Sequence, residues 1–418
     1  MAFPKMMRVR QQFEAPDVDD IAATVKEQIE GLNLSGKVKA GDSVAITVGS
    51  RGIANIAVIT KAIVDAIKDL GGEPFVVPAM GSHGGGKAEG QQQIIESYGV
   101  TEAFIGCPIK ATMEVVQVGT VEGEVPVYFD KYAAAADHVV VSGRIKPHTG
   151  FVGEIESGLH KMMLIGLGKH KGATIYHKAI VQYSFDRIIR AVAQEVIDKC
   201  NVLFGLAMVE NQYDRSAMIE AVPPEKFMER EKELLVLAKK WMPRLPFDQI
   251  DLLIVDYIGK DISGAGMDTN VVGRKFYEHH ASEKELPKIT RILVRDLTPD
   301  THGNASGIGV AEYVHQRVVD QMNVEATVIN CMTGNSPAAA QIPIVFPTDE
   351  VCISQALDTV GFVSHENARV VRILDTLHVE EVLVSEVYAK EVAAREDLSV
   401  IGPPVEMKFD DSGDLLPL

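Results

Sequence analysis

Apolar and polar positions along the first half of the chain predict a repeated strand–helix–strand pattern. An apolar run at 43–48 predicts a buried strand. Between 54 and 70, apolar residues recur at three- and four-residue steps, which predicts an amphipathic helix that ends at Gly71 and Gly72. A second apolar run at 74–77 completes the unit, so the two strands are expected to be parallel neighbours with a right-handed crossover.

The same pattern continues to residue 241, after an initial segment of about forty residues that we interpret as a lead-in. We expect helices at 18–31, 89–98, 185–199 and 225–241, a β-rich excursion at 107–130, and a buried strand at 138–141.

Two prolines, Pro243 and Pro246, interrupt a helical pattern before a new apolar run and mark the best domain boundary. We therefore predict an N-terminal domain at 1–245 and a C-terminal α/β domain at 246–418. The strands expected in the second domain are 252–256, 291–295, 326–330 and 370–374. The predicted fold class is α/β, with two domains of mostly parallel sheets flanked by helices and an active site in the interdomain cleft.

Composition narrows the choice of partners. A net charge of −17, with no basic run, argues against nucleic acid or an anionic membrane as the main partner. No apolar stretch approaches the ~20 residues of a membrane-spanning helix, and the first residues lack the apolar block of a signal peptide. The four cysteines are far apart in the sequence, which fits a reducing, cytoplasmic location. The oligomeric state stays open.

Three predicted strands of the first domain each end in a polar loop. The loops carry Arg51, His83 and His148. Because ligands bind outside the carboxyl ends of strands in an open parallel sheet, these side chains could share one crevice. Histidine is the usual acid or base near neutral pH, so His83 and His148 are candidates for proton exchange on two faces of one carbon. The alternative is that each histidine only caps its own loop.

The stretch at 139–177 combines many titratable side chains with glycines, including His160, Lys161, His170 and His177. A solvated surface loop is the simplest interpretation. However, many intervening positions are too apolar to lie in water, which favours a functional segment. The stretch has no HExxH motif and no nearby cysteine, so it does not indicate a zinc protease. An imidazole could still ligate nickel, iron, copper or zinc if a cofactor supplied the other donors.

The segment Gly81–Ala88, GSHGGGKA, nearly matches a phosphate-binding P-loop. Position 88 is alanine, so the hydroxyl that would hold Mg²⁺ is missing. A degenerate nucleotide-binding loop therefore remains only an alternative, although its glycines could still cradle an anion.

Five of these residues together resemble the nickel-dependent lactate racemase family, whose members use a nickel-pincer nucleotide. The resemblance is clearest from 44 to 177 and follows the order and approximate spacing of five motif positions. It implies that Arg51 binds the substrate carboxylate and that His83 and His148 are the catalytic histidines. It also implies that Lys161 carries the cofactor covalently and that His177 ligates its nickel.

The resemblance implies an isomerase that racemises or epimerises a small 2-hydroxy acid by reversible hydride transfer. Protein made without the cofactor-building enzymes is then expected to lack the nickel-pincer nucleotide. The run 48–52 and the acidic loop 154–160 depart from the family pattern, so the chain resembles a divergent branch.

The glutamine and lysine that the family brings from its second domain have no evident match in this chain. In their place, loops at 261–274 and 296–309 offer Arg274 and His302 as substrate-binding candidates, with Asp268, Asn270 and Asn304 nearby. Loop capping is the competing interpretation of these side chains. For the whole chain, the alternative function is a relative that binds a carboxylate or phosphate without racemising it.

Overall fold

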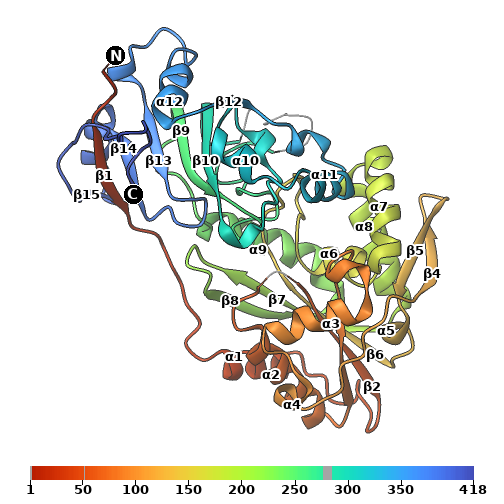
Figure 1. Ribbon diagram of the computed structural model, residues 1–418. Coiled ribbons are helices and arrows are strands. Elements are labelled where there is room, and N and C mark those ends of the chain that lie inside the picture. Colours follow the sequence, from red (N-terminus) through yellow and green to blue (C-terminus); the bar gives the residue numbers. More distant parts are fainter. Residues whose placement is uncertain (1, 51, 276–284) are drawn as a thin grey trace. The chain divides into compact units, whose positions relative to one another are not determined.

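The computed structural model describes residues 2–50, 52–275 and 285–418. The chain divides into two compact units (Figure 1). The N-terminal unit comprises Ala15–His148 and Val152–Met242, and the C-terminal unit comprises Met1–Glu14, Thr149–Phe151 and Pro243–Leu418. Each unit is built from a mixed, mostly parallel sheet with helices, which confirms the predicted α/β class.

The N-terminal unit contains a five-stranded sheet in the order β3-β2-β6-β7-β8. The first four strands are parallel, and β8 pairs with β7 in the antiparallel sense. The strands are β2 (Ser43–Val48), β3 (Glu73–Pro78), β6 (His138–Arg144), β7 (Val202–Glu210) and β8 (Ser216–Val222). A separate antiparallel hairpin, β4 (Val115–Val121) and β5 (Val125–Asp130), accounts for the predicted β-rich excursion.

Apolar residues at helical spacing account for the helices of this unit. In the second helix, Ile56, Ile59, Ile63 and Ile67 are buried at three- and four-residue steps, so one face of the helix packs into the hydrophobic core of the unit. The helices are α1 (Ile21–Gly31), α2 (Ile56–Asp69), α3 (Ala88–Ser97), α4 (Glu102–Ile105), α5 (Lys131–Ala134), α6 (Leu159–Lys161), α7 (Lys169–Tyr183), α8 (Phe185–Lys199) and α9 (Phe227–Trp241).

The strand order gives the N-terminal unit a topological switch point between β2 and β6. From β2 the chain crosses to β3 on one side and later returns to β6 on the other. Near the carboxyl ends the two strands are tied by side chains: Ser142 N donates to Thr47 Oγ1 at 2.8 Å, and Ser142 Oγ donates to the Thr47 carbonyl at 2.6 Å. Ligands of open α/β sheets bind at this kind of position.

The C-terminal unit contains an eight-stranded sheet in the order β12-β11-β10-β9-β13-β14-β1-β15. The five strands from β12 to β13 are parallel, and the remaining three pair in the antiparallel sense. The strands are β1 (Met6–Gln11), β9 (Gln249–Ile258), β10 (Lys288–Leu297), β11 (Tyr313–His315), β12 (Ile344–Phe346), β13 (Val370–Ile373), β14 (Glu381–Ser385) and β15 (Leu398–Val400). The helices are α10 (Gln316–Gln321), α11 (Val324–Thr333), α12 (Asp349–Leu357) and α13 (Ala389–Ala393).

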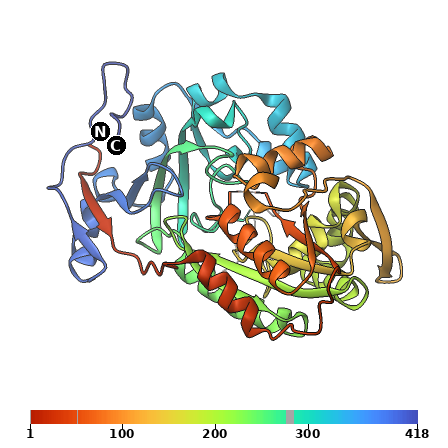
Figure 2. The same ribbon diagram turned by 90° about the horizontal axis from the view of Figure 1, so that it is seen from below.

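The first residues of the chain belong to the C-terminal unit and do not lead into the N-terminal domain. The predicted N-terminal domain, 1–245, therefore differs from the structure over these first residues. Strand β1 pairs with β14 and β15, so the red first strand lies among the blue last strands in Figures 1 and 2. Met6, Met7 and Val9 are buried in this pairing. A six-residue strand whose partners lie more than 370 residues away gives no local signal of which domain it joins.

The strand predicted at 326–330 is wrong, because α11 covers it. The side chain of Asn323 accepts a hydrogen bond from Ala326 N and caps this helix. The short run at 326–330, with Val328 and Ile329, resembles a buried strand, but periodicity alone cannot assign such runs to a strand or a helix.

A buried chain of alternating charges crosses the C-terminal sheet and holds the end of the polypeptide. Arg372 binds Asp256 through two hydrogen bonds of 2.8 and 2.9 Å, and Arg295 lies 2.8 Å from the same carboxylate. Arg295 also donates to Asp349 Oδ2 at 2.6 Å, and that oxygen accepts from Leu415 N at 2.9 Å. Neither Asp256 nor Asp349 is exposed, so each carboxylate depends on its arginine partner.

Replacing Asp349 by alanine should lower the free energy of unfolding by about 3–5 kcal/mol, because Arg295 would lose one partner in a buried site. Urea denaturation monitored by circular dichroism measures this loss. Glu350→Ala, at the exposed next position of the same helix turn, is the matched control and should cost under about 1 kcal/mol. Equal losses in the two variants would contradict the role of the charge chain.

Candidate active site

The carboxyl ends of β2, β3 and β6 lie at one edge of the N-terminal sheet, as predicted. The loop after β2 meets the loop after β3 directly, because Ser50 Oγ hydrogen-bonds to His83 Nδ1. Arg51 itself lies outside the described residues. The bond fixes the orientation of the His83 ring through its Nδ1 atom.

The loop that carries His83 is held by Gln91, a residue with no predicted role. Gln91 is fully buried, and its Nε2 donates to the carbonyls of Met80 and Gly81 at 2.7 and 3.0 Å. Glycine is needed at position 84, where φ is +65° and a Cβ would lie 2.5 Å from the Gly90 carbonyl carbon. The loop thus folds back on the first turn of α3.

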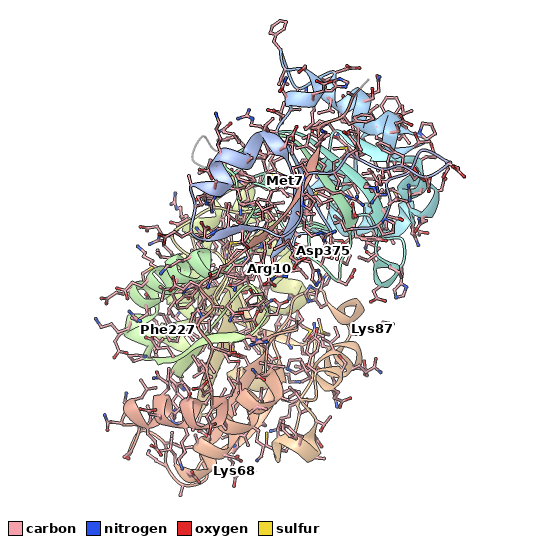
Figure 3. The ribbon with its side chains drawn as sticks, turned by 90° about the vertical axis from the view of Figure 1, so that its left-hand side faces the viewer. Met7, Arg10, Lys68, Lys87, Phe227 and Asp375 are labelled. Atoms are coloured by element: carbon pink, nitrogen blue, oxygen red, sulfur yellow. The ribbon has the colours of Figure 1, made fainter. Side chains whose placement is uncertain are left out.

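In this loop, Lys87 is exposed (Figure 3). A P-loop lysine must turn toward bound phosphates. The structure therefore adds no support to the nucleotide-binding alternative.

Lys169, at the start of α7, is a second residue that the sequence did not single out. It is fully buried, and its Nζ donates to the Pro78 carbonyl at the end of β3 and to Gln91 Oε1 at 3.3 Å. Asp130 Oδ2 lies 3.1 Å from the same ammonium group. Burial lowers the pKa of Lys169, and the Asp130 carboxylate opposes that shift. One cation therefore joins α7, the end of β3 and the His83 loop.

Replacing Lys169 by methionine should cost about 3–5 kcal/mol of unfolding free energy, since Asp130 would keep a buried charge without its partner. Lys178→Met, at an exposed position of the same helix, should change stability by less than about 1 kcal/mol. Thermal and urea unfolding of both variants measure the difference. A Lys169 variant as stable as the wild type would show that the buried cation does not hold these elements together.

His148 follows β6, and its backbone is fixed by a buried carboxylate. His148 N donates to Glu156 Oε2 at 2.7 Å, while Lys239 Nζ lies 2.6 Å from Glu156 Oε1. The His148 ring lies 6.0 Å from the Phe185 ring, centroid to centroid. The acidic loop that departed from the family pattern therefore supplies the group that positions His148.

The segment that follows Lys161 packs directly on the strand ends. Residues Met162–Gly166 form a π-helical turn, a rare element that is frequent at functional sites. Three glycines at the strand ends contact this turn. An added Cβ would come within 3.3 Å of Met162 at Gly49, 2.8 Å of Met162 at Gly143, and 3.1 Å of Ile165 at Gly81. Met162, the residue after Lys161, therefore packs against Gly49, which directly precedes Ser50.

Gly143→Ala should cost about 1–3 kcal/mol of stability and displace the turn after Lys161, because the new methyl group would overlap Met162 Cγ and crowd the Gly158 carbonyl. Gly31→Ala is the control, since nothing lies within 4 Å of its added Cβ. Unfolding free energies and the methyl NMR signal of Met162 report the two effects. An unmoved Met162 signal in a fully stable Gly143→Ala protein would contradict this packing.

His177, on α7, interacts electrostatically with Lys161. Burial lowers the pKa of His177 from its ordinary value, and the Lys161 ammonium group lowers it further. Because the Coulomb effect requires proximity, the two residues named by the family resemblance lie near each other. A lowered pKa keeps the imidazole neutral near pH 7, which is the form that binds a metal.

The other two histidines of the central stretch have different surroundings. His160 is buried, and its Nδ1 lies 2.6 Å from Glu231 Oε2. Its ring contacts Phe227 edge-on. Phe227, labelled in Figure 3, lies at the start of α9. His170 is exposed. His160 thus anchors the turn before Lys161 to α9, a role that its lone position in the sequence did not indicate.

The C-terminal candidates are mostly engaged in loop structure. Arg274 donates to Glu312 Oε1 at 2.7 Å and to the carbonyls of Val310 and Ile289 at 2.8 Å. These partners precede β11 or begin β10, so Arg274 lies at the amino-terminal edge and its bonds support a structural role. His302 is exposed after the carboxyl end of β10, with a left-handed φ of +49°.

The three remaining polar candidates of these loops also bond within their own loops. Asp268 Oδ1 accepts from Asn270 N at 2.9 Å. Asn304 Oδ1 accepts from Ser306 Oγ at 2.7 Å. Both contacts are of the capping kind that was the competing interpretation.

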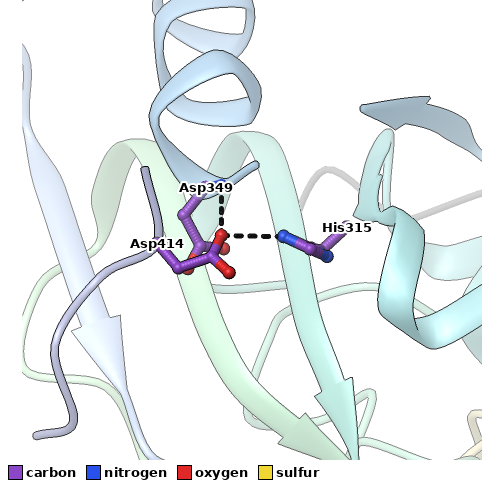
Figure 4. A group of neighbouring side chains, drawn as sticks. All are labelled: His315, Asp349 and Asp414. Carbon is purple, nitrogen blue, oxygen red and sulfur yellow. Dashed lines mark hydrogen bonds and ion pairs between the residues drawn. The ribbon is translucent and has the colours of Figure 1, made fainter. Parts of the chain in front are cut away.

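One group of possible metal ligands, His315, Asp349 and Asp414, brings its ligand atoms within 4.8 Å of one another (Figure 4). Arginines already neutralise both carboxylates, with Arg295 2.6 Å from Asp349 and Arg317 2.8 Å from Asp414. His315 Nδ1 accepts from Arg317 N at 3.0 Å, so its Nε2 carries the proton shared with Asp414 at 2.9 Å. This group is a charge-balanced network and not a cation site.

No helix in the described parts of the chain is long and apolar enough to cross a membrane. All four cysteines are free and buried.

The fold is that of an α/β protein with two compact units. The candidate site lies at the strand ends of the N-terminal unit, and the segment between β6 and β7 carries Lys161 and His177. Residues 5–186 match the family model of the lactate racemase N-terminal domain. The match begins at β1, which pairs inside the C-terminal sheet. None of the curated proteins compared with the chain matches it.

Solved structures show the same fold. A protein from Thermotoga maritima superposes with a TM-score of 0.52 at 13% identity, covering 88% of this chain and 99% of that one. The lactate racemase apoprotein from Thermoanaerobacterium thermosaccharolyticum gives the same TM-score of 0.52 and identity of 13%, covering 88% and 94%. The likeness to lactate racemase therefore extends over both units at the level of the fold.

Proposed function

We propose that this protein is an isomerase that racemises or epimerises a small 2-hydroxy acid with a nickel-pincer nucleotide. The observation that carries the proposal is the packing of the segment after Lys161 on the glycines at the ends of β2, β3 and β6. That packing, the Ser50–His83 bond and the match of residues 5–186 to the lactate racemase N-terminal domain all support the proposal.

The residues present suit such a cofactor. Lys161 offers a primary amine for a covalent link, and His177 offers an imidazole whose lowered pKa leaves its nitrogen free for nickel. When bound, the nickel-pincer nucleotide supplies the acceptor for the hydride of the substrate's C2 carbon. Within the chain, α7 and the π-helical turn hold the two cofactor residues in place.

The chain's own residues supply binding and proton transfer. His83, oriented by Ser50, removes the proton of the C2 hydroxyl or returns it. His148, held through Glu156, serves the opposite face. Arg51 binds the carboxylate through its planar guanidinium, a role that rests on its place in the sequence. In the C-terminal unit, His302 is the exposed candidate for the far end of the substrate, whereas the bonds of Arg274 favour a structural role.

Protein made together with the cofactor-building enzymes should contain nickel and a mass increment that disappears in Lys161→Ala. In that protein, His83→Ala and His148→Ala should each lower racemisation of L-lactate or a related 2-hydroxy acid at least ~10²-fold, the range of general acid–base catalysis. Intact mass, metal analysis and chiral chromatography provide the measurements.

The control is His138→Gln, at the amino end of β6 and so at the opposite edge of the same sheet, which should retain full activity. Full activity without nickel would contradict the cofactor assignment. Ligand binding with no turnover of any 2-hydroxy acid would instead favour a non-racemising relative.

A further inference from the structure

The chain leaves the N-terminal unit directly after His148 and returns to it at Val152. The three residues in between, Thr149–Phe151, belong to the C-terminal unit. His148 therefore lies one peptide bond away from a segment of the C-terminal unit. Because only two soft backbone dihedrals per residue separate them, whatever fixes the backbone of Thr149 also limits where the His148 ring can lie.

Thr269, in the loop after β9, holds that backbone. Its Oγ1 donates to the Thr149 carbonyl at 2.6 Å, although the two residues are 120 positions apart in the sequence. Thr269 has no exposed surface. A threonine hydroxyl that caps a turn bonds to the backbone within about four residues of itself, so capping does not explain this bond. Within the C-terminal unit, the bond ties the loop after β9 to the residue that follows His148.

The loop that carries Thr269 is itself held by several hydrogen bonds. Asp268 N donates to Thr376 Oγ1, in the loop after β13, at 2.9 Å. Asp268 Oδ1 accepts from Asn270 N at 2.9 Å, and Arg274 N donates to the Thr269 carbonyl at 2.9 Å. Since β9 and β13 are parallel neighbours, their loops leave the same edge of the sheet and support each other. Thr269 is therefore a fixed anchor and not part of a free surface turn.

The backbone around His148 is thus held on both sides of the ring. The His148 N–H donates to Glu156 Oε2 at 2.7 Å, and the carbonyl of the next residue accepts from Thr269. Glu156 is 2% exposed and Thr269 is 0% exposed. Buried bonds of this kind are costly to lose, because water does not readily replace the missing partner. Removing the Thr269 hydroxyl should release one of the two anchors without changing His148 itself.

We propose that Thr269 is a positioning residue for His148, and that its hydroxyl holds the Thr149 carbonyl so that the imidazole keeps the orientation required for proton transfer. The inference rests on the proposed function, in which His148 is catalytic. Because Thr269 is fully buried, it acts through the backbone and is not itself a catalytic residue. The C-terminal unit thereby contributes to the placement of a catalytic group.

Histidine-ring NMR of the full-length chain, made without the cofactor, tests the placement. Thr269→Val keeps the shape of the side chain and loses the hydroxyl, whereas Thr269→Ser keeps the hydroxyl. With ¹⁵N-labelled histidine, the His148 ring signals, assigned through His148→Gln, should shift in Thr269→Val and return close to the wild-type position in Thr269→Ser. The signals of His160, which is held by Glu231, should stay in place in both variants and report an intact fold.

Kinetics of protein loaded with the nickel-pincer nucleotide test the consequence. For L-lactate or a related 2-hydroxy acid, Thr269→Val should lower kcat about tenfold to hundredfold, the effect of a misplaced catalytic group. KM should change little, because Arg51, the proposed carboxylate ligand, is untouched. Thr269→Ser should recover most of the lost activity. In a His148→Ala background, Thr269→Val should cause no further loss, since Thr269 acts only through that ring.

Ser385→Ala is the matched control. The Ser385 hydroxyl is also fully buried and accepts from Val370 N at 3.0 Å, but at the amino end of β13 and so at the opposite edge of the same sheet. This variant should lose stability, measured by urea unfolding, and keep the wild-type kcat and the His148 signals.

The proposal is overturned if the His148 signals do not move in Thr269→Val, if that variant keeps the wild-type kcat, or if Thr269→Ser loses as much activity. A further loss in the His148→Ala background would also overturn it, because Thr269 would then act by another route. Failure of the proposed function has a different sign: the wild type itself would racemise no 2-hydroxy acid. The NMR comparison alone would then decide whether Thr269 places the His148 ring.

Discussion

The buried ammonium group of Lys169 is the interaction on which the candidate active site depends. It binds the last carbonyl of β3, reaches Gln91 in the His83 loop, and pairs with Asp130 at the end of β5. Because Lys169 also begins α7, the helix that carries His177 is fixed relative to the loop that carries His83. A fully buried cation is tolerated only when such partners surround it, so the network defines one geometry for these elements.

The geometry of the candidate site also depends on glycines at the ends of three strands. The turn after Lys161 approaches the ends of three strands so closely that side chains at Gly49, Gly81 or Gly143 would meet it. The apolar character of 162–167, which argued against a solvated loop, is explained by this contact with the strand ends. Lys161, the proposed cofactor residue, therefore directly precedes a packed turn, and such rigid support is what a precise site requires.

Much of the fold could be predicted because its elements carry local signals. The apolar stripe of α2 and the short apolar runs of β2 and β3 gave their positions to within one or two residues. Where the signal is not local, the prediction failed. Strand β1 joins partners at the far end of the chain, and the apolar run of α11 does not distinguish a helix from a strand until its Asn323 cap is considered.

The candidate site shows the same limit. The residues at strand ends could be named from the sequence, since polar loops after apolar runs mark a functional edge. The residues that orient them could not: Glu156, Gln91 and Glu231 act through hydrogen bonds to partners that only the folded chain brings near.

The central claim is that His83 and His148 work beside a cofactor that holds a hydride, and the fate of a C2 label tests it most directly. Protein loaded with the nickel-pincer nucleotide is given C2-deuterated L-lactate in ordinary water, and the deuterium content of the D-lactate product is measured by mass spectrometry. A hydride does not exchange with solvent, so the account predicts that the label stays on C2 and that the deuterated substrate reacts more slowly. Loss of the label to water would show that the histidines abstract the C2 proton directly and would contradict the account.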